Sequence, residues 1–404
     1  MKRTLLILVA AAASLSFVAP VRGEDWYRWR GPRLDGISTE SDWKVQWPAS
    51  GPPVAWKTPL GVGFSSVAIA QGRLYTMGNE EDHDTVHCLE AASGTAVWRH
   101  KYDAPLDDRE FEGGPTATPT VDGDRVYTLS RQGLLFALDA ATGRVCWSND
   151  LRETTGLRVP GWGFSGSPLV HGDLLLLAVG EAGVAVNKST GTLLWKSADK
   201  DAGYTTPLPF QHAGQWYALI ASGRKFHAVN IQTGEEWWRH RWVTSFGCNA
   251  TDPIVLGDRV FLCSGYSRGA ALLKLSDKEP EVLWSNKDLR AQFSSCVLID
   301  GHLYGIDGDA PHKRSLKCLS FDSGEVRWSD DGIQAAALTA SPGRLIIQGE
   351  QGELIIARVS PESLQPLARA QVLRGKCWTV PVLSNGRIYC RSAEGELVCL
   401  DVRK

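Results

Sequence analysis

The chain has 404 residues, and its 43 basic and 45 acidic side chains leave a net charge of −2 at pH 7. A charge so close to balance argues against nucleic acid as a partner and provides no polybasic patch for a membrane surface. The 16 tryptophans and 41 glycines are typical of a turn-rich all-β protein and indicate no function by themselves.

Residues 1–23 have the pattern of a secretory signal peptide. A basic pair precedes an apolar run from Leu5 to Ala19, and Gly23 offers an acceptable cleavage position. The first cysteine is Cys88, so the lipid-modified N-terminal cysteine of a bacterial lipoprotein is missing. No other run reaches the roughly 18 apolar residues that a membrane-spanning helix needs. We therefore expect an exported, soluble and monomeric protein in the periplasm or outside the cell.

Residues 24–52 form a tryptophan-rich extension that fits no strand repeat. Indole rings in a segment without secondary structure of its own are not expected to stay in water. We expect them to fix the extension across the rest of the fold, with attachment to a partner as the alternative. The tryptophans are Trp26, Trp29, Trp43 and Trp47.

Residues 53–404 contain a repeat with a period of 43 to 49 residues. In each clear copy a glycine is followed four residues later by a tryptophan, and one degenerate copy precedes the last pair. A period in the forties, made of short alternating apolar runs, is the spacing of a β-propeller blade. The pairs are Gly94/Trp98, Gly143/Trp147, Gly191/Trp195, Gly234/Trp238 and Gly324/Trp328.

The clearest copy runs from Thr116 to Trp147 and contains four apolar runs, each ended by a turn signal. Four strands per repeat follow from this pattern. In the third turn, Asp139 and Thr142 can bond local backbone amides, and Gly143 can take the left-handed conformation. Trp147 then stands on the outermost strand, where its indole has a large apolar body to bury and one N–H to satisfy. We predict that it is a wedge between neighbouring blades.

Eight inner strands can be counted, but only seven outer strands follow them. The last repeat stops on its third strand, whereas an unassigned outer-strand sequence with Trp56 precedes the first repeat. We therefore predict an all-β, eight-bladed propeller of four-stranded antiparallel blades, closed by pairing of residues 53–58 with residues 396–401. Closure removes the exposed sheet edges of an open array. The inner strands start near Ser65, Thr116, Ser165, Thr205, Asn249, Ser294, Ala335 and Thr379. The outer strands end at Trp98, Trp147, Trp195, Trp238, Trp284, Trp328 and, without tryptophan, around Leu367.

Nine cysteines in an exported protein raise the question of disulfides. Cys88, Cys318 and Cys399 occupy the slot that Ala137 fills in its repeat, which indicates small buried residues and not bonded ones. Cys390 and Cys399 flank a hairpin turn, so a disulfide between them stays open, although cross-strand geometry is often strained.

The run from Asp139 to Trp147 resembles the repeat of the pyrroloquinoline-quinone (PQQ) superfamily, whose tryptophan-docking repeats build eight-bladed propellers. Residues 187–195 and 230–238 match the same motif, and the resemblance covers residues 53–403. It implies one of two branches: quinoprotein dehydrogenases, which hold PQQ and calcium on the axis, or BamB-like propellers, which bind no cofactor and act as scaffolds in outer-membrane protein assembly. Residues 26–32, 62–66 and 161–168 also resemble a group of exported bacterial propellers described as PQQ-binding-like.

The features of the dehydrogenase branch are not found in this sequence. It has no adjacent cysteine pair and no c-type haem motif, and it is shorter than those enzymes. Asn249 and Asp252 are the nearest candidates for calcium ligands, but polar residues at the start of an inner strand commonly satisfy local backbone. We therefore predict no catalytic, cofactor-binding or metal-binding residues and disfavour PQQ with calcium.

Residues 79–87 form the densest cluster of acidic and imidazole side chains. A calcium site or a mixed histidine and aspartate site is conceivable there. We expect an ordinary solvated hairpin loop instead.

A recurring aromatic residue stands just before most inner strands. These positions ring one mouth of the central channel, where they could form an apolar rim for a ligand or for a partner's extended segment; alternatively, each ring packs on the preceding blade. Two long connections, 103–115 and 151–162, rise on the same side and carry Arg109 and Trp162. The candidate binding face is therefore Arg109, Trp162, Phe164, Tyr204, Phe246, Phe293 and Trp378, and Phe64 shares the pattern.

Three functions compete on this sequence. The leading hypothesis is a non-catalytic exported scaffold that binds a protein, an extended polypeptide or a ligand at one mouth of the propeller. The second is a PQQ-dependent dehydrogenase or a related small-molecule enzyme. The third is a carbohydrate-binding or polymer-binding propeller that uses Trp162 and its aromatic neighbours as stacking surfaces.

Overall fold

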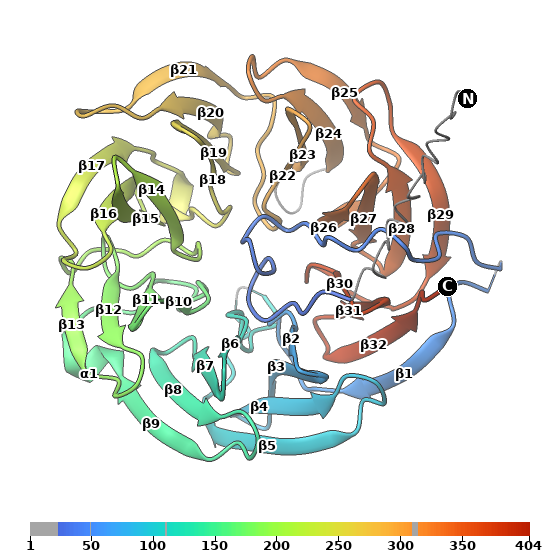
Figure 1. Cartoon of the computed structure of the whole chain (residues 1–404), viewed down its shortest axis with the longest axis horizontal. Helices are drawn as coiled ribbons and strands as arrows, with labels where there is room; N and C mark the ends of the chain where they lie inside the picture. Colours follow the sequence, from blue (N-terminus) through green and yellow to red (C-terminus); the bar gives the residue numbers. More distant parts are fainter. Residues whose placement is uncertain (1–22, 49, 110, 309–313) are drawn as a thin grey trace, which may run out of the picture.

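A computed structural model describes residues 23–48, 50–109, 111–308 and 314–404. In this part of the chain, 32 β-strands form eight four-stranded sheets, which are arranged as blades around a central axis (Figure 1). The predicted eight-bladed propeller is thereby confirmed. The predicted signal peptide, apart from Gly23, lies outside the described residues. Among the helices of the described residues, none has the length and apolar character that crossing a membrane requires.

Each blade runs from a short inner strand at the axis to an outer strand at the circumference. Blade 1 contains β2 (Ala68–Ala70), β3 (Arg73–Glu80), β4 (His83–Glu90) and β5 (Ala96–Asp103). Blade 2 contains β6 (Thr120–Asp122), β7 (Arg125–Leu129), β8 (Leu134–Asp139) and β9 (Val145–Asp150). Blade 3 contains β10 (Leu169–His171), β11 (Leu174–Leu177), β12 (Val184–Asn187) and β13 (Leu193–Lys196). Blade 4 contains β14 (Leu208–His212), β15 (Gln215–Ala221), β16 (Lys225–Asn230) and β17 (Glu236–Arg241).

The remaining blades have the same order. Blade 5 contains β18 (Ile254–Leu256), β19 (Arg259–Ser264), β20 (Gly269–Lys274) and β21 (Glu281–Asn286). Blade 6 contains β22 (Val297–Ile299), β23 (His302–Asp307), β24 (Ser315–Ser320) and β25 (Val326–Asp330). Blade 7 contains β26 (Ala335–Ser341), β27 (Arg344–Gly349), β28 (Glu353–Arg358) and β29 (Gln365–Gln371). Blade 8 contains β30 (Val382–Ser384), β31 (Arg387–Arg391), β32 (Glu396–Asp401) and β1 (Val54–Pro59). Two short helices, α1 (Leu151–Thr155) and η1 (Ser245–Gly247), lie in connections between blades.

The hydrophobic core lies between the blades. Each of the eight buried apolar clusters in the described residues combines side chains of two neighbouring blades. In one of them, Tyr127 and Leu135 of blade 2 pack with Leu175 and Val184 of blade 3. A four-stranded sheet alone could not bury both of its faces, so each blade depends on its two neighbours.

The outer-strand tryptophans dock on the following blade, as predicted. Trp147 donates its indole N–H to the carbonyl of Lys188 at 3.0 Å, and its ring lies against Gly191. A Cβ atom on Gly191 would lie 2.5 Å from the Trp147 ring. The tryptophan ring of the preceding blade therefore leaves no room for a side chain at the glycine of each motif. The same indole bonds are Trp56 to Ala91, Trp98 to Ala140, Trp195 to Ile231, Trp284 to Phe321 and Trp328 to Ser360.

A small residue lies across the sheet from the docking tryptophan in most blades. Ala137 pairs with Trp147, and Cys88 and Cys318 occupy the same position opposite Trp98 and Trp328. These cysteines are free and buried. Their interpretation as small packing residues is confirmed.

The joint between blades 4 and 5 departs from this pattern. Trp238 is only 3% exposed, yet its indole N–H has no hydrogen-bond partner among the described residues. The corresponding turn of blade 5, residues 275–280, contains no glycine. The degenerate repeat in the sequence therefore corresponds to the joint between blades 4 and 5, where the docking tryptophan lacks its hydrogen bond.

The ring closes as predicted, through pairing of the first and last strands. β1 is antiparallel to β32, with Val54 opposite Leu400 and Pro59 opposite Glu396. The pairing places Trp56 opposite Cys399, in the position that docking tryptophans occupy in other blades. Blade 8 therefore consists of both ends of the propeller chain.

A buried guanidinium bridges the closing joint. Arg391 on β31 donates to the carbonyls of Ser65 and Met77 at 2.7 and 2.6 Å and to the hydroxyl of Thr76 at 3.0 Å, all in or next to blade 1. A further bond of 3.1 Å reaches the carbonyl of Gly61. Burial lowers the pKa of Arg391 to about 9, so the group stays charged at neutral pH. Four acceptors replace the hydration that this charge loses.

The disulfide between Cys390 and Cys399, which the sequence left open, is not formed. The ladder places Tyr389 opposite Cys399 and Cys390 opposite Val398. Because successive side chains of a strand point to opposite faces, the two thiols lie on different faces of the sheet. Both cysteines are free.

The expectation of a solvated loop at residues 79–87 is also wrong. Strands β3 and β4 continue to Glu80 and from His83, which leaves only a tight turn between them. Asn79 donates to Asp84 at 2.8 Å, and both side chains are buried, as is His87. Within the described ranges, no group of three or more histidine, cysteine or acidic side chains could hold a metal ion.

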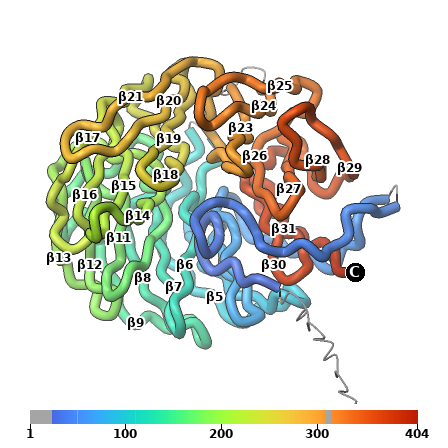
Figure 2. Tube along the Cα trace, turned by 45° about the horizontal axis from the view of Figure 1, so that its top comes forward, coloured from blue at the N-terminus to red at the C-terminus, as the bar shows by residue number. Residues whose placement is uncertain are grey.

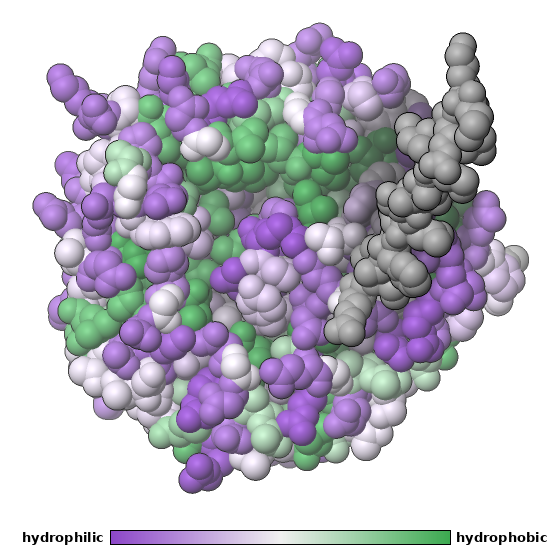
Figure 3. Space-filling view, viewed as in Figure 1, coloured by the Kyte–Doolittle hydropathy of each residue, from purple (hydrophilic) through white to green (hydrophobic). Residues whose placement is uncertain are grey.

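The tryptophan-rich extension crosses one face of the ring. Residues 24–48, which we call the N-terminal segment, run over blade tips and over the axis (Figures 1 and 2). Bridges join Trp26 to Ile69, Ile37 to Ala340 and Trp43 to Arg403. In the space-filling view of this face, polar side chains fill the centre of the ring (Figure 3). The N-terminal segment therefore covers one end of the axial channel.

The contact between Trp147 and Gly191 predicts a specific pattern of stabilities. Gly191→Ala combines the strain of a positive φ (+74°) with a steric clash, so we expect it to lower the free energy of unfolding by about 2–4 kcal/mol. Gly214 has a similar φ (+79°) and no neighbour within 4 Å, so Gly214→Ala isolates the backbone strain. Urea denaturation of both variants, and of Gly191→Ala combined with Trp147→Ala, measures the clash. Equal losses of unfolding free energy in Gly191→Ala and Gly214→Ala would contradict the packing of Trp147 against Gly191.

The closing strand is expected to be essential. A protein that lacks the residues before Leu60 loses β1, the docking tryptophan of blade 8 and one side of a joint. We expect no cooperative thermal unfolding transition for this truncated protein, measured by circular dichroism beside the complete chain. A melting temperature within a few degrees of the complete chain would show that the ring does not depend on closure.

The free energy of unfolding should decrease when the pH falls from about 6.5 towards 4. Burial, with a contribution from the charge of Arg391, lowers the pKa of His87 to about 4. Because the unfolded chain binds the proton at higher pH, the stabilisation by neutral His87 is complete above about pH 6.5 and is lost at lower pH, by about 1.4 kcal/mol per pH unit. Urea denaturation at pH 7 and pH 5 measures this loss. His87→Gln should reduce the pH dependence of the free energy of unfolding.

Candidate functional site

The axial channel is open at the end opposite the N-terminal segment. The chain segments that lead into the inner strands converge there and surround a cavity of about 380 Å³. We call it the axial cavity, and we call its rim of aromatic side chains the aromatic mouth. The aromatic mouth consists of Phe64, Phe111, Trp162, Tyr204, Tyr266, Phe293 and Trp378.

The N-terminal segment supplies the floor of the axial cavity. Trp29 lines the cavity and donates its indole N–H to a carboxylate oxygen of Asp252 at 2.6 Å. Arg30, which is fully buried, lies 4.0 Å from the same carboxylate and donates to the carbonyl of Cys296 at 2.8 Å. These bonds anchor the segment in the centre of the ring. Among the described residues, the N-terminal segment therefore bounds the axial cavity on its Trp29 side.

One side of the aromatic mouth is a continuous row of four rings. Trp378 lies 4.3 Å from Phe293 and 5.8 Å from Phe64 between ring centroids, and both pairs are stacked. Phe111 lies 5.6 Å from Phe64 at the end of the row. The guanidinium of Arg314 is 4.8 Å from the centre of the Phe293 ring, which adds a cation–π contact. These rings hold one another in place without a ligand.

The opposite arc of the ring carries a second group of aromatic side chains. The centroid of Trp162 is 5.6 Å from that of Tyr204 and 6.3 Å from that of Phe246. Phe246 is 77% exposed, has a φ of 62° in η1, and contacts Tyr266 at 5.5 Å. The two groups of rings face the axial cavity from two sides.

The polar groups of the axial cavity are neutral. None of the described residues that line it carries a formal charge. Burial raises the pKa of the Cys248 thiol to about 11 and raises the pKa of Tyr204 as well, so both keep their protons. Gln292 is 4% exposed and donates its amide N–H to Cys248 at 3.0 Å, while its carbonyl Oε1 has no partner.

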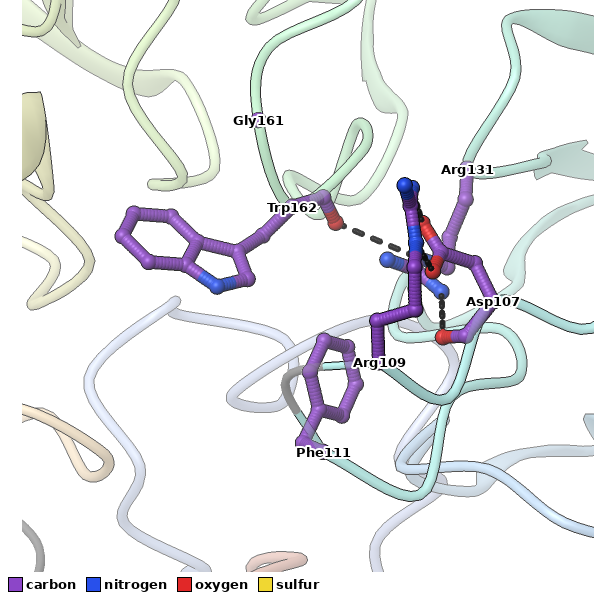
Figure 4. Close-up of a pocket in the computed structure, with 6 residues that line it drawn as sticks. All are labelled: Asp107, Arg109, Phe111, Arg131, Gly161 and Trp162. Atoms are coloured by element: carbon purple, nitrogen blue, oxygen red, sulfur yellow. Dashed lines mark hydrogen bonds and ion pairs between the residues drawn. The ribbon is translucent and has the colours of Figure 1, made fainter.

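A smaller pocket of about 180 Å³ adjoins the axial cavity and shares two of its rings (Figure 4). Arg109 donates two bonds, of 2.8 and 2.9 Å, to Asp107, which lowers the pKa of this carboxyl group to about 2. Arg131 donates to the carbonyls of Trp162 and Asp107, both at 3.1 Å, and lies over the Phe111 ring. The two long connections of the sequence are thereby tied together beside the aromatic mouth.

The structure brings most of the predicted binding residues to one end of the ring. Trp162, Tyr204, Phe293 and Trp378 line the axial cavity, while Arg109 lines the adjoining pocket and Phe246 stands at the edge. Phe164 does not belong to the rim. Its side chain is 1% exposed and packs between blades 2 and 3, as the alternative reading of these aromatic positions proposed.

The lining residues that were not predicted include Trp29, Phe111, Tyr266 and Gln292. Phe111 lies in one of the two connections that were selected as binding loops, and Trp29 lies in the extension that was expected to cross the fold. Their sequence signals were therefore present but not specific. Gln292 precedes a rim aromatic and has no distinguishing signal in a single sequence.

The nearest candidates for calcium ligands are used in internal bonds. Asn249 is fully buried, accepts from the Ser264 hydroxyl at 3.0 Å and donates to the carbonyls of Ser222 and Trp242. Asp252 accepts bonds from Trp29, from the amide of Thr206 and from the hydroxyl of Ser295. Both residues connect neighbouring parts of the ring, as expected for polar residues at a strand start.

Comparison with known proteins gives one family match and several relatives. The sequence model of the family described as outer membrane protein assembly factor BamB matches residues 82–330. BamB of Yersinia pestis is 23% identical over 360 residues, which cover 84% of this chain and 87% of that protein. Polyvinylalcohol dehydrogenase of a Pseudomonas species is 30% identical over 129 residues, which cover 30% of this chain but only 19% of that protein.

Solved structures with similar folds include members of the same two groups. The crystal structure of BamB from Moraxella catarrhalis superimposes with a TM-score of 0.64 and 16% identity, over 87% of this chain and all of that chain. The quinohemoprotein alcohol dehydrogenase of Comamonas testosteroni gives a TM-score of 0.68 and 12% identity, over 93% of this chain and 80% of that one. At these identities the likeness shows a shared fold and no more.

Proposed function

Because the chain belongs to the outer membrane protein assembly factor BamB family, we propose that it is a non-catalytic scaffold that binds an extended segment of polypeptide at its aromatic mouth. The observation that carries the proposal is the aromatic mouth itself, a set of rings around a neutral cavity. Its partner belongs to the assembly of outer-membrane proteins, either an unfolded client or a component of the machinery.

The physical basis is a rigid ring that presents aromatic contact area. Tryptophan, tyrosine and phenylalanine bury large surfaces while losing little side-chain entropy, which is why such residues dominate the binding energy of protein interfaces. The rings of the aromatic mouth already contact one another, so binding requires little reorganisation. The side chains of an extended polypeptide project alternately to either side and can enter a cavity of this kind.

The second candidate is a quinoprotein dehydrogenase, and the shared fold is the observation in its favour. In that branch the cofactor is PQQ with calcium, which prefers several carboxylate and carbonyl ligands. The described lining of the axial cavity contains no carboxylate, and the oxygens of Asp252 and Asn249 accept internal bonds. These residues do not fit calcium-bound PQQ, so we propose that the protein works without this cofactor.

We also propose that the protein acts in the periplasm as a single chain. The signal-like pattern of residues 1–23 and the family of the chain support this location. Cell fractionation, N-terminal sequencing of the processed protein and light scattering after gel filtration test it. A stable oligomer, or a protein found outside the periplasmic fraction, would contradict it.

The proposal predicts that replacing one aromatic side chain of the aromatic mouth by alanine weakens polypeptide binding. The probe is a fluorescein-labelled outer-membrane β-barrel protein, diluted unfolded from urea, and the measurement is fluorescence anisotropy. Trp162→Ala and Phe111→Ala should each weaken its binding by about tenfold or more, as expected for interface hot spots, with little change in melting temperature. Trp216→Ala is the matched control, because Trp216 is a 42% exposed tryptophan at the start of β15, on the opposite face.

Equal binding by the parent and by both mouth variants would refute the proposed function. The enzyme alternative is tested in the same preparation with PQQ and calcium. A quinone absorbance that persists through gel filtration, together with dye reduction by alcohols, would overturn the scaffold proposal.

A further inference from the structure

The smaller pocket beside the aromatic mouth, which we call the arginine pocket, differs from the axial cavity in its charge. Its volume is about 180 Å³. Two guanidinium groups and one carboxylate among its described lining residues leave one net positive charge at neutral pH, whereas the described lining of the axial cavity carries none. The lining residues are Asp107, Arg109, Phe111, Arg131, Gly161 and Trp162.

Arg131 is a buried guanidinium without a carboxylate in direct contact. The residue is 7% exposed, and its Nε and Nη1 atoms donate to the backbone carbonyls of Trp162 and Asp107. Among the described residues, the carboxylates of Asp84 and Asp107 act on its charge only at longer range. Burial lowers the pKa of Arg131, but a guanidinium keeps its proton at neutral pH. Its positive charge is therefore incompletely balanced.

Two N–H groups of the arginine pocket are unused. The Nη2 atom of Arg131 makes no hydrogen bond to a described residue and is not enclosed by the protein. The indole N–H of Trp162 also donates to no described residue. Figure 4 shows both guanidinium groups beside Asp107, with the rings of Trp162 and Phe111 next to them. The arginine pocket therefore offers donors and positive charge without a matching acceptor.

These donors select a negatively charged oxygen group. Guanidinium N–H groups form their strongest hydrogen bonds with carboxylates and phosphates, because the charges attract and the geometry matches. A lysine or arginine side chain of a ligand would instead meet a net positive charge. In an unmodified polypeptide the negatively charged groups are carboxylates, either of aspartate and glutamate side chains or of the chain terminus.

The position of the arginine pocket defines what lies next to the carboxylate. The pocket shares Phe111 and Trp162 with the axial cavity, so a ligand that fills one continues into the other. The axial cavity is uncharged and surrounded by rings, which favours an apolar group. A carboxylate with a neighbouring apolar side chain matches both cavities at once.

We propose that the arginine pocket binds a carboxylate group of the extended polypeptide, with Arg131 as hydrogen-bond donor and Arg109 as a second positive charge, while an adjacent apolar side chain occupies the axial cavity. This inference rests on the proposed function and names the charged group that the site takes. Asp107 holds the Arg109 guanidinium at the pocket through two hydrogen bonds.

The experiment compares two pairs of twelve-residue peptides of glycine, serine and threonine, all acetylated at the N-terminus. The first pair ends in phenylalanine with either a free or an amidated terminus. The second pair is amidated and contains a central phenylalanine followed by aspartate or asparagine. Binding to the full chain is measured by isothermal titration calorimetry without a dye, because common dyes are themselves anionic. In at least one pair the carboxylate peptide should bind about tenfold more tightly, as expected for one charge-assisted hydrogen bond.

The pair that shows the gain identifies the source of the carboxylate. A gain in the first pair alone assigns the pocket to a chain terminus, and a gain in the second pair alone assigns it to an acidic side chain. Gains in both pairs show that the pocket accepts either source.

Substitutions test whether the arginine pocket causes the gain. Arg131→Gln should eliminate it, and Arg109→Gln, at a side chain that is 83% exposed, should reduce it to about threefold or less. Both variants should bind the neutral peptides as the parent does. Arg158→Gln is the matched control, because Arg158 is also exposed and paired with an aspartate, Asp199, but lies outside the pocket lining. Thermal melting confirms that the variants are folded.

The remaining outcomes separate the inference from the proposed function. Equal affinities within both pairs would overturn the carboxylate site, and so would a gain that persists in Arg131→Gln and Arg109→Gln or that disappears in Arg158→Gln. If the unfolded β-barrel protein binds while no carboxylate peptide gains affinity, the inference is refuted and the scaffold function stands. If neither the protein nor any peptide binds, both proposals fail.

Discussion

The fold depends on the contact between the indole of one blade and the glycine of the next. A blade of four strands cannot bury its own faces, and the docked ring fills the joint while its N–H caps a carbonyl of the neighbour. Because each blade is positioned by the one before it, the ring exists only if the last joint closes like the others. Trp56 meets this condition by docking on blade 1 beside Gly94. The rigid mouth is a consequence, since its segments lead directly into blades that cannot shift independently.

The periodic features of the sequence predicted the periodic features of the structure. The repeat predicted the blade number, the docking rings and the closing strand, since all of these recur with the same spacing. One prediction that depended on exact strand register failed. Cys390 and Cys399 were placed opposite each other, but a shift of one residue moves a side chain to the other face. At residues 79–87 the many charges suggested a loop, whereas Glu81 and Asp82 adopt positive φ values in a two-residue turn and the strands continue up to it.

The candidate site was predictable to the level of loops but not of single side chains. Phe64 and Phe164 stand in the same position of their repeats, yet one lines the axial cavity and the other is buried. The connections before them differ in length, because residues 60–63 follow β1 whereas residues 151–163 follow β9. Trp29 and Gln292 reach the cavity through tertiary placement, which a repeat pattern does not contain. The residues that give the site its depth and its polarity were thus the ones that sequence reasoning missed.

The N-terminal segment also fixes how the molecule can be attached to anything else. Gly23 contacts Asn385 at the tip of the hairpin between β30 and β31, and Trp43 pairs with Arg403 near Lys404. Both described ends of the chain therefore leave on the face that the segment covers. A tether, a fused domain or a solid support joined to either end holds the ring with its aromatic side turned away from the point of attachment. Such a joined molecule presents its entrance to the surrounding solution without any reorientation of the blades.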